Sequence, residues 1–225
     1  VAGVILTDSV RRYVLADEVG LGKTIEAGIV ISDLLAQKPA AKILVLCPST
    51  LTQQWLCELY SKFGGHVFKL LDLHARYAAN SLQKVICSTT HAAYDVPHIL
   101  SSIQWDMIVV DEVHELVASS ELYDFVQKLS RNRSPLLLLS AVPAQRREDD
   151  LLRLLTLLEP DRYKTAKSSA EFAQLYAAQS EIGRRLRRFS SRIEGHKKNE
   201  YSNQDVLDFA KKLGSLSAVE NDPVL

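Results

Sequence analysis

The sequence predicts an α/β fold, a three-layer domain in which helices cover both faces of a mostly parallel sheet. Short runs of apolar and β-branched residues alternate with longer helical patterns over the first 158 residues. The runs are apolar throughout, which is typical of strands buried on both faces of a parallel sheet. The predicted strands are residues 13–16, 43–47, 67–71, 84–88, 107–110 and 136–140. The clearest predicted helices are residues 24–36 and 51–62.

The pattern changes after residue 158. From Glu159 onward the sequence has helical patterns and a polar stretch but no convincing strand. We therefore expect a strand-rich domain over residues 1–158 and a helical C-terminal extension over residues 159–225, which ends in a truncated linker. Because the chain begins with Val1 rather than methionine, we expect it to be a piece of a longer protein.

Composition excludes several classes of protein. The chain has 225 residues, of which 47% are hydrophobic, so it can bury a sizeable core. Lys plus Arg and Asp plus Glu both total 27, so any contact with nucleic acid must be local. No apolar run approaches the roughly 20 residues that cross a bilayer, and no signal peptide opens the chain. These features predict a cytoplasmic protein with no membrane partner.

The three cysteines, Cys47, Cys57 and Cys87, form no CxxC pair and lie in or beside apolar runs. A chain with this cysteine usage is typical of a reducing compartment, so we expect buried free thiols rather than disulfides or a zinc site. The histidines show neither HExxH nor HxH spacing. We therefore expect no protein-bound metal beyond an ion that accompanies a nucleotide.

A phosphate-binding loop follows the first strand. Residues 17–24 read DEVGLGKT and lead directly into a helix. Glycines let backbone N–H groups turn toward a phosphate, and the helix N-terminus adds a positive dipole end. Lys23 is predicted to reach the β- and γ-phosphates, and the Thr24 hydroxyl to hold Mg²⁺. The predicted ATP contacts are Gly20, Leu21, Gly22, Lys23, Thr24 and Ile25.

Two acidic residues directly follow the predicted strand at residues 107–110. Asp111 and Glu112 would lie at the carboxyl edge of a parallel sheet, where ligands bind in open α/β folds. Asp111 is predicted to hold Mg²⁺ together with Thr24, and Glu112 to orient or deprotonate the attacking water. Lys23, Asp111 and Glu112 are therefore the predicted catalytic residues. His114 takes a role only from the resemblance below.

Together these motifs resemble the Swi/Snf family of ATPases within helicase superfamily two. Residues 15–24 are similar to its motif I, ADExGLGKT, which also accounts for Asp17 where the general loop pattern has glycine. Residues 43–51, followed by Gln54-Trp55, resemble motif Ia, and residues 111–114, DEVH, resemble the DExH box. Residues 138–145 resemble motif III, and the leucine-rich helix at 150–160 follows it. The loop reads closest to the bacterial branch that includes an RNA-polymerase-recycling ATPase.

The resemblance implies one RecA-like lobe of a two-lobed motor. It assigns the coupling of ATP hydrolysis to movement to His114, Ser140 and Gln145, although Val142 replaces the threonine that is usual in motif III. The second lobe, which would supply arginine fingers, has no counterpart in these residues. The implied cofactors are ATP and Mg²⁺, and the implied partners are double-stranded DNA and RNA polymerase or another nucleoprotein in the bacterial nucleoid.

The resemblance also implies that the first lobe contacts the DNA backbone. Small hydroxyls and backbone amides at strand ends suit phosphate and carry no sequence information. The basic run at residues 184–188 is a further phosphate candidate, although a solvated helix face is the simpler interpretation. The predicted DNA contacts are Pro48, Ser49, Thr50, Gln54, Ser88, Thr89, Thr90, Arg184, Arg185, Arg187 and Arg188.

Two other functions fit parts of the pattern. A strand-separating helicase of the DExH type would share Lys23, Asp111, Glu112 and His114, but the GLGKT loop and the Gln54-Trp55 pair argue against it. A degenerate nucleotide-binding scaffold that acts through protein contacts would explain Val142, but the intact catalytic residues argue against decay. The function predicted best is an ATP-dependent double-stranded DNA translocase that remodels protein–DNA complexes.

Overall fold

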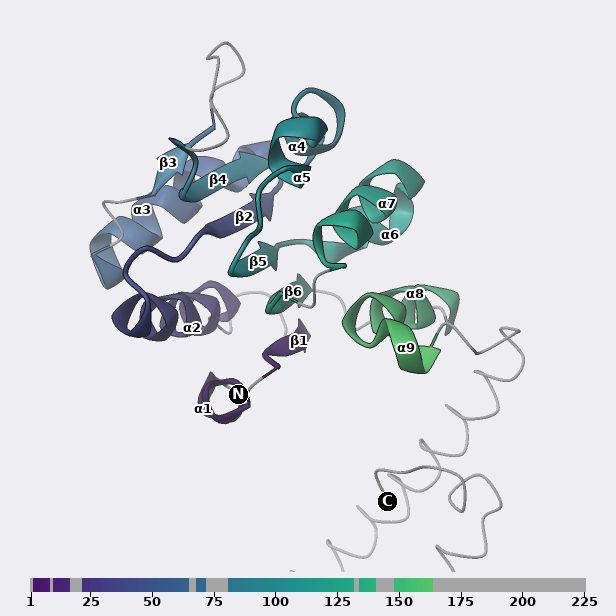
Figure 1. Ribbon diagram of the computed structural model, residues 1–225, viewed down its shortest axis with the longest axis horizontal. Coiled ribbons are helices and arrows are strands. Elements are labelled where there is room, and N and C mark those ends of the chain that lie inside the picture. The colour runs from purple at the N-terminus through teal and green to yellow at the C-terminus, as the bar shows by residue number, and fades with distance from the viewer. Residues whose placement is uncertain are drawn as a thin grey trace, which may run out of the picture. The chain divides into compact units, whose positions relative to one another are not determined.

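The computed structural model describes residues 2–8, 10–16, 22–64, 68–71, 81–131, 134–140 and 148–163 (Figure 1). The chain divides into two compact units, residues 1–163 and 164–225, and every described residue belongs to the first unit. Most of the extension expected over residues 159–225 therefore lies outside the described residues. That extension and the predicted boundary after Leu158 stay predictions.

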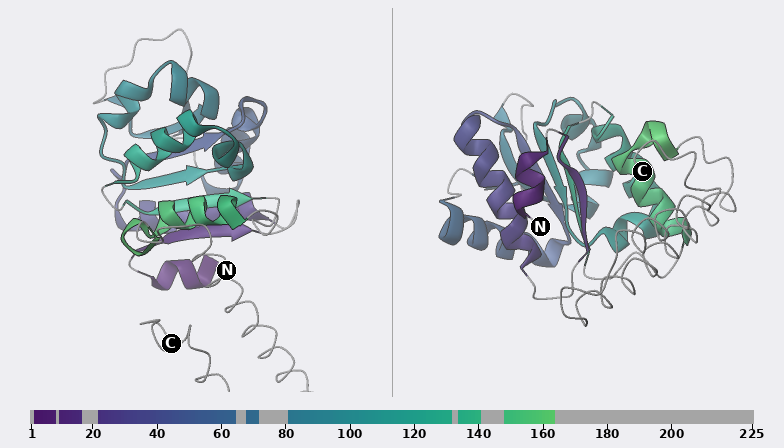
Figure 2. Two further views of the ribbon diagram at one scale, coloured as in Figure 1. Left: turned by 90° about the vertical axis from the view of Figure 1, so that its right-hand side faces the viewer. Right: turned by 90° about the horizontal axis from the view of Figure 1, so that it is seen from below.

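A six-stranded sheet forms the middle layer, in the order β1-β6-β5-β2-β4-β3. Every pair of neighbouring strands is parallel, so the arrows point the same way (Figure 2). The predicted α/β fold is confirmed, and four strands have the predicted bounds. The strands are β1 (Arg12–Ala16), β2 (Ile43–Cys47), β3 (Lys69–Leu70), β4 (Lys84–Ser88), β5 (Met107–Val110) and β6 (Leu136–Ser140).

Helices cover both faces of the sheet (Figures 1 and 2). One face packs against α1 (Ala2–Thr7), α2 (Lys23–Gln37) and α3 (Thr52–Phe63). The other face packs against α4 (Thr89–Tyr94), α5 (Pro97–Ser101), α6 (Val113–Ala118), α7 (Ser120–Leu129) and α8 (Glu148–Leu158). A 3-10 turn, η1 (Ser49–Leu51), precedes α3, and α9 (Pro160–Tyr163) follows α8. None of the helices in the described residues has the length and apolarity that a membrane span requires.

The alternation of side chains along each strand divides the core into two layers. In β5, Ile108 and Val110 pack against the helices α4–α8, whereas Met107 and Val109 pack against α1–α3. All four side chains are fully buried. A strand with helices on both faces has no solvent-facing side, which explains why these runs contain no polar alternation.

Arg12, at the start of β1, connects the sheet to the ends of two helices. Its guanidinium donates to the backbone oxygen of Leu158 at 2.8 Å and to that of Ser134 at 2.6 Å, and it also reaches Leu157 and Ser130. The Ser130, Leu157 and Leu158 oxygens lie at the C-termini of α7 and α8, where a positive charge is favourable, and Ser134 lies just before β6. The contact keeps α8 beside β1.

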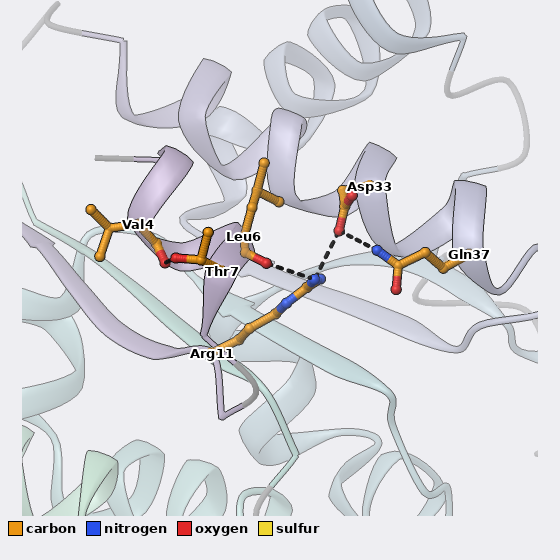
Figure 3. A network of polar contacts seen from close by, with 6 residues as sticks. All are labelled: Val4, Leu6, Thr7, Arg11, Asp33 and Gln37. Carbon is orange, nitrogen blue, oxygen red and sulfur yellow. Dashed lines mark hydrogen bonds and ion pairs between the residues drawn. The ribbon is translucent and has the colours of Figure 1, made fainter.

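A second arginine connects α1 to α2 (Figure 3). Arg11 has a left-handed backbone, with φ of 50°. Its guanidinium lies 2.9 Å from the Asp33 carboxylate and also donates to the backbone oxygen of Leu6. Gln37 donates to the same Asp33 oxygen at 2.7 Å. The network fixes the direction in which the chain enters β1.

Helices α2 and α3 approach each other closely at Gly28. A Cβ placed on Gly28 would lie 2.3 Å from the ring of Phe63. That distance is far below van der Waals contact, so only glycine permits this approach. Because α3 carries residues of the site described below, Gly28 fixes where those residues lie.

We predict that Gly28→Ala destabilises the fold even though alanine is the better helix former. The new methyl group must displace the Phe63 ring, and overpacking of this kind costs about 1–3 kcal/mol, against a gain of about 1 kcal/mol from helix propensity. Urea unfolding measures the net change. The control is the same substitution in a Phe63→Ala background, where the clash is absent and alanine should be neutral or stabilising. Equal effects in both backgrounds would contradict the close packing.

Candidate nucleotide-binding site

Four neighbouring strands end at the same edge of the sheet. Ala16 at the end of β1 is aligned with Ser140 at the end of β6, and Leu46 near the end of β2 is aligned with Val110 at the end of β5. Since β6 alone separates β1 from β5, and adjacent strands lie about 4.8 Å apart, the ends of β1 and β5 are about 10 Å apart. The segments after these strands therefore meet at the carboxyl edge.

Helix α2 presents its N-terminus at this edge. Gly22 is its N-cap in a left-handed conformation, with φ of 91°, and the Gly22 oxygen accepts from the Glu26 amide at 2.9 Å. Lys23, Thr24 and Ile25 form the first turn and are half-buried. The first amides of a helix have no partner within it, so they and the helix dipole form a site for an anion. The predicted contacts Gly20 and Leu21 lie outside the described residues.

Asp111, the first residue after β5, is fixed by its backbone and by both carboxylate oxygens. Its amide donates to the Leu46 oxygen at 2.8 Å, which extends the pairing of β5 with β2. Oδ1 accepts from the Glu112 amide at 2.9 Å, and Oδ2 accepts from the indole nitrogen of Trp55 at 2.8 Å. The side chain is buried, with 8% of the residue exposed. Its orientation is therefore set before any ligand binds.

Glu112 follows in a strained backbone conformation. Its φ of 51° and ψ of 55° lie in the left-handed region, which a non-glycine residue adopts at a cost of order 1–3 kcal/mol. Its Oε2 lies 3.1 Å from Nδ1 of His114, close enough for an ion pair when the histidine is protonated. The geometry makes no hydrogen bond, so this buried oxygen has no hydrogen-bond partner among the described residues. Glu112 thus retains an oxygen that can accept a proton.

The side chains present are suitable for Mg²⁺ that arrives with a nucleotide. The two printed donors that reach the Asp111 carboxylate from the described residues are neutral N–H groups, so neither supplies a positive charge of its own. Thr24 supplies a hydroxyl at the start of α2. Within the described ranges no three His, Cys, Asp or Glu side chains form a metal site of their own. Mg²⁺ is commonly held by one or two protein ligands together with phosphate oxygens and water, which matches this pair.

The residues predicted to couple hydrolysis to movement are only partly described. Ser140 is the last residue of β6, which lies between β1 and β5 in the sheet, and it is 3% exposed. His114 lies on the surface, with 56% of its side chain exposed. Gln145 and Val142 lie outside the described residues. The structure therefore brings Ser140 to the same edge as the two acids but does not describe the rest of motif III.

The predicted DNA contacts after β2 lie on the surface. Ser49 and Thr50 in η1 are exposed, and Pro48 is half-buried. Gln54 is exposed in the first turns of α3, where its amide donates to Glu58 at 2.9 Å. The carboxyl end of β2 therefore presents the hydroxyls and the amide that the sequence predicts.

The threonines after β4 differ from each other. Ser88 caps α4 by accepting from the His91 amide at 3.2 Å. Thr89 is 4% exposed and donates to Glu115 at 3.2 Å, so its hydroxyl faces another side chain rather than solvent. Thr90 is exposed. Of the two threonines, Thr90 is the one available to a phosphate. The arginines 184, 185, 187 and 188 lie outside the described residues.

Comparison with known proteins identifies the family. The pattern of the SNF2-related domain matches residues 6–211, most of the chain. This chain belongs to the SNF2-related family. The predicted resemblance is thereby confirmed.

Bacterial relatives in the SNF2-related family carry the name RNA polymerase-associated protein RapA. The protein from Pectobacterium carotovorum is 40% identical in an alignment 167 residues long, with a coverage of 68% of this chain and 17% of that protein. The protein from Vibrio atlanticus is 35% identical in an alignment 214 residues long, with a coverage of 87% of this chain and 22% of that protein. The chain thus spans about a fifth of the length of these relatives.

Solved structures place the fold in the same family. The Sulfolobus solfataricus SWI2/SNF2 ATPase core in complex with double-stranded DNA superposes with a TM-score of 0.58 at 26% identity. The alignment covers 72% of this chain and 33% of that core. The Sulfolobus solfataricus SWI2/SNF2 ATPase core domain gives a TM-score of 0.57 at 25% identity. The expected RecA-like α/β lobe is confirmed.

Reasoning from sequence missed the role of one residue in this SNF2-family site. Trp55 is buried in α3, at 1% exposure. Its indole also bonds the carboxylate of Asp111, which is 56 positions away in the sequence. The Gln-Trp pair marked the residue, but no pattern indicates which distant acid an indole nitrogen will meet.

The cysteines correct another expectation. Cys47 and Cys87 are buried free thiols, as predicted, but Cys57 is exposed. Cys57 lies in α3 between the buried Trp55 and Leu59, so the helical period turns it to the opposite face. Burial raises the pKa of the Cys47 thiol to about 12, and the nearby Asp111 charge adds to the effect. Burial likewise raises the pKa of Cys87 to about 12.

We predict that one thiol of the folded chain reacts rapidly with a thiol reagent at pH 8. Only the thiolate is nucleophilic. At Cys47 and Cys87 the raised pKa keeps the thiol protonated at pH 8, and burial keeps the reagent away from it. Counting modified thiols by mass should give one in buffer and all three in denaturant. Cys57→Ser should abolish the rapid reaction. Rapid reaction of Cys47 or Cys87 in that variant would contradict the burial of β2 and β4.

Proposed function

We propose that the chain is the ATP-binding first lobe of an ATP-dependent double-stranded DNA translocase, which couples ATP hydrolysis to movement on DNA and remodels protein–DNA complexes. One observation carries the proposal. The N-terminus of α2, with Lys23 and Thr24, and the acids after β5, Asp111 and Glu112, meet at one edge of the sheet. This pairing of an anion site with a buried carboxylate suits a nucleotide with its magnesium ion.

In this proposal each residue has a role that follows from its charge or its hydrogen-bonding groups. Lys23 and the first amides of α2 hold the β- and γ-phosphates, while Thr24 and Asp111 hold Mg²⁺. The ion neutralises charge on the phosphate oxygens. Glu112 orients the attacking water and receives its proton on Oε2, which accepts no hydrogen bond from the described residues. His114, Ser140 and Gln145 couple this chemistry to movement of the lobe.

The surface after β2 supports the DNA part of the proposal. Exposed Ser49 and Thr50, beside Pro48, and the amide of Gln54 can bond phosphates without reading sequence. Thr90 adds a contact from α4, and the arginines at 184–188 would add charge. The archaeal core that resembles this chain was solved with double-stranded DNA, which favours a duplex. Thr89 is left out of this proposal because it bonds Glu115.

We further propose a longer cytoplasmic protein, associated with the nucleoid, in which residues 159–225 lead toward a second lobe. The relatives named RNA polymerase-associated suggest RNA polymerase, or another nucleoprotein, as the target. Arginine fingers would come from the second lobe, as the family resemblance implies.

We predict that Lys23→Ala abolishes binding of ATP and ADP. The substitution removes the positive charge that faces the β- and γ-phosphates. Titration with fluorescent nucleotide in Mg²⁺ buffer measures affinity. The matched control is Lys38→Ala, at the other end of α2, which breaks only a surface pair with Asp106 at 2.7 Å. That variant should bind like the unaltered chain. Equal affinity of the Lys23 variant and the unaltered chain would reject the nucleotide site.

We predict that this chain alone hydrolyses ATP slowly and that DNA does not accelerate it. An arginine finger contributes on the order of 10³–10⁵-fold in rate, and the fingers are expected in the second lobe. The measurement is phosphate release at saturating ATP, for this chain and for a longer protein that carries both lobes.

The same assay separates the candidate functions. The two-lobed protein should be stimulated by duplex DNA more than by single-stranded DNA or RNA. Preference for a single strand or for RNA would indicate a strand-separating helicase, and no hydrolysis under any condition would indicate a scaffold. Full DNA-stimulated turnover by the 225-residue chain would contradict the two-lobe mechanism.

A further inference from the structure

We infer that Trp55 is a positioning residue for the magnesium ligand Asp111, and that its indole N–H fixes which carboxylate oxygen faces the nucleotide. The inference rests on the proposed function, because it assigns Asp111 to Mg²⁺. It begins from one contact, the 2.8 Å hydrogen bond from Trp55 Nε1 to Asp111 Oδ2. Trp55 would then act through Asp111, without contacting the nucleotide.

The contact is buried on both sides. Trp55 is 1% exposed and is among the largest fully buried side chains, and Asp111 is 8% exposed. A hydrogen bond to a charged group is stronger than one between neutral groups. Water therefore competes poorly for Oδ2, so the indole holds this oxygen before any ligand arrives.

The two carboxylate oxygens are held by different means. Oδ1 accepts from the Glu112 amide, which is one residue away and belongs to the same turn. Oδ2 is held from α3, a separate element on the face of the sheet that carries α1 and α2. The pair of donors fixes rotation of the carboxylate, and only the lone pairs that they leave open can meet a cation. Partners of this kind typically change metal affinity by about 10–100-fold.

Helix α3 also connects the Trp55–Asp111 contact to the protein surface. The helix runs from Thr52 to Phe63, so the exposed Gln54 and the buried Trp55 are adjacent in its first turns. Under the proposed function, a duplex bound at η1 and Gln54 would act on the same helical turn that holds Asp111. Trp55 thus connects the proposed DNA surface to the proposed nucleotide site through the described residues.

Packing alone would also explain a buried tryptophan, and the chain contains a matched control. Trp105 is 2% exposed, and its indole donates to the backbone oxygen of Leu100 at 2.9 Å. It packs in the other core layer, with α4–α8. Trp105→Phe therefore replaces a buried indole by a phenyl ring and removes one indole hydrogen bond, as Trp55→Phe does, but it leaves the contacts of Asp111 unchanged.

The first test compares Trp55→Phe, Trp105→Phe and the unaltered chain. Affinity for fluorescent ADP is measured with Mg²⁺ and again with EDTA, below the melting temperature of all three proteins. We expect Trp55→Phe to lose about tenfold in the Mg²⁺ buffer, to lose nothing in EDTA, and Trp105→Phe to lose nothing in either. Unchanged Mg²⁺-dependent affinity in Trp55→Phe would overturn the inference. So would an equal loss in EDTA or an equal loss in Trp105→Phe.

The second test needs no nucleotide and no altered tryptophan. The chain has two tryptophans, so a ¹⁵N spectrum shows two indole N–H signals. Asp111→Ala should move the Trp55 signal and expose its proton to solvent exchange, while the Trp105 signal stays in place. An unmoved Trp55 signal would overturn the contact. If the unaltered chain binds no ADP in either buffer, the proposed function fails, and this spectrum still decides the contact.

Discussion

Parallel pairing of the four strands β1, β6, β5 and β2 is the constraint on which the candidate site depends. Parallel strands that share a register also share an edge at which they end, so the chain after each strand emerges beside the chain after its neighbour. Ala16, Ser140 and Val110 are far apart in sequence and become neighbours only through this pairing. A shift of one register step would move the acids after β5 relative to the phosphate loop. Burial on both faces prevents such a shift, because it would exchange the side chains of the two core layers.

Two contacts, one near each end, hold helix α3 in position. Near its C-terminus, Phe63 lies against the bare backbone of Gly28 in α2. Near its N-terminus, Trp55 bonds Asp111 at the end of β5. The helix that begins in the proposed DNA surface is therefore packed against the helix proposed to bind phosphates and bonded to the strand end proposed to bind Mg²⁺. Close packing transmits displacements because well-packed interiors are stiff. This arrangement gives the proposed coupling of DNA and nucleotide a physical basis within one lobe.

The polar groups at this edge are held in costly states before a ligand binds. The buried Asp111 carboxylate accepts hydrogen bonds from neutral donors in the part of the chain that the structure describes, and Glu112 adopts a left-handed backbone. Buried carboxylates and strained residues lower stability unless a ligand compensates them. A nucleotide with its magnesium ion would supply that compensation, so binding should be aided by relief of these costs. The neutral thiol of Cys47 adds no charge beside Asp111, since burial raises its pKa to about 12.

The sequence by itself determined the strands, the motifs and their order. Apolar runs such as residues 43–47 and 107–110 are typical of strands covered on both faces, and the loop at 17–24 and the acids after β5 are local patterns whose chemistry depends on neighbouring residues. The short helices α4, α5 and α6 escaped prediction because segments of five or six residues carry too little periodicity. The tertiary structure alone decided the partner of Trp55, the burial of Thr89 and the need for glycine at position 28. Each of these depends on a residue distant in sequence, and a hydrogen bond or a close approach leaves no local pattern at either end.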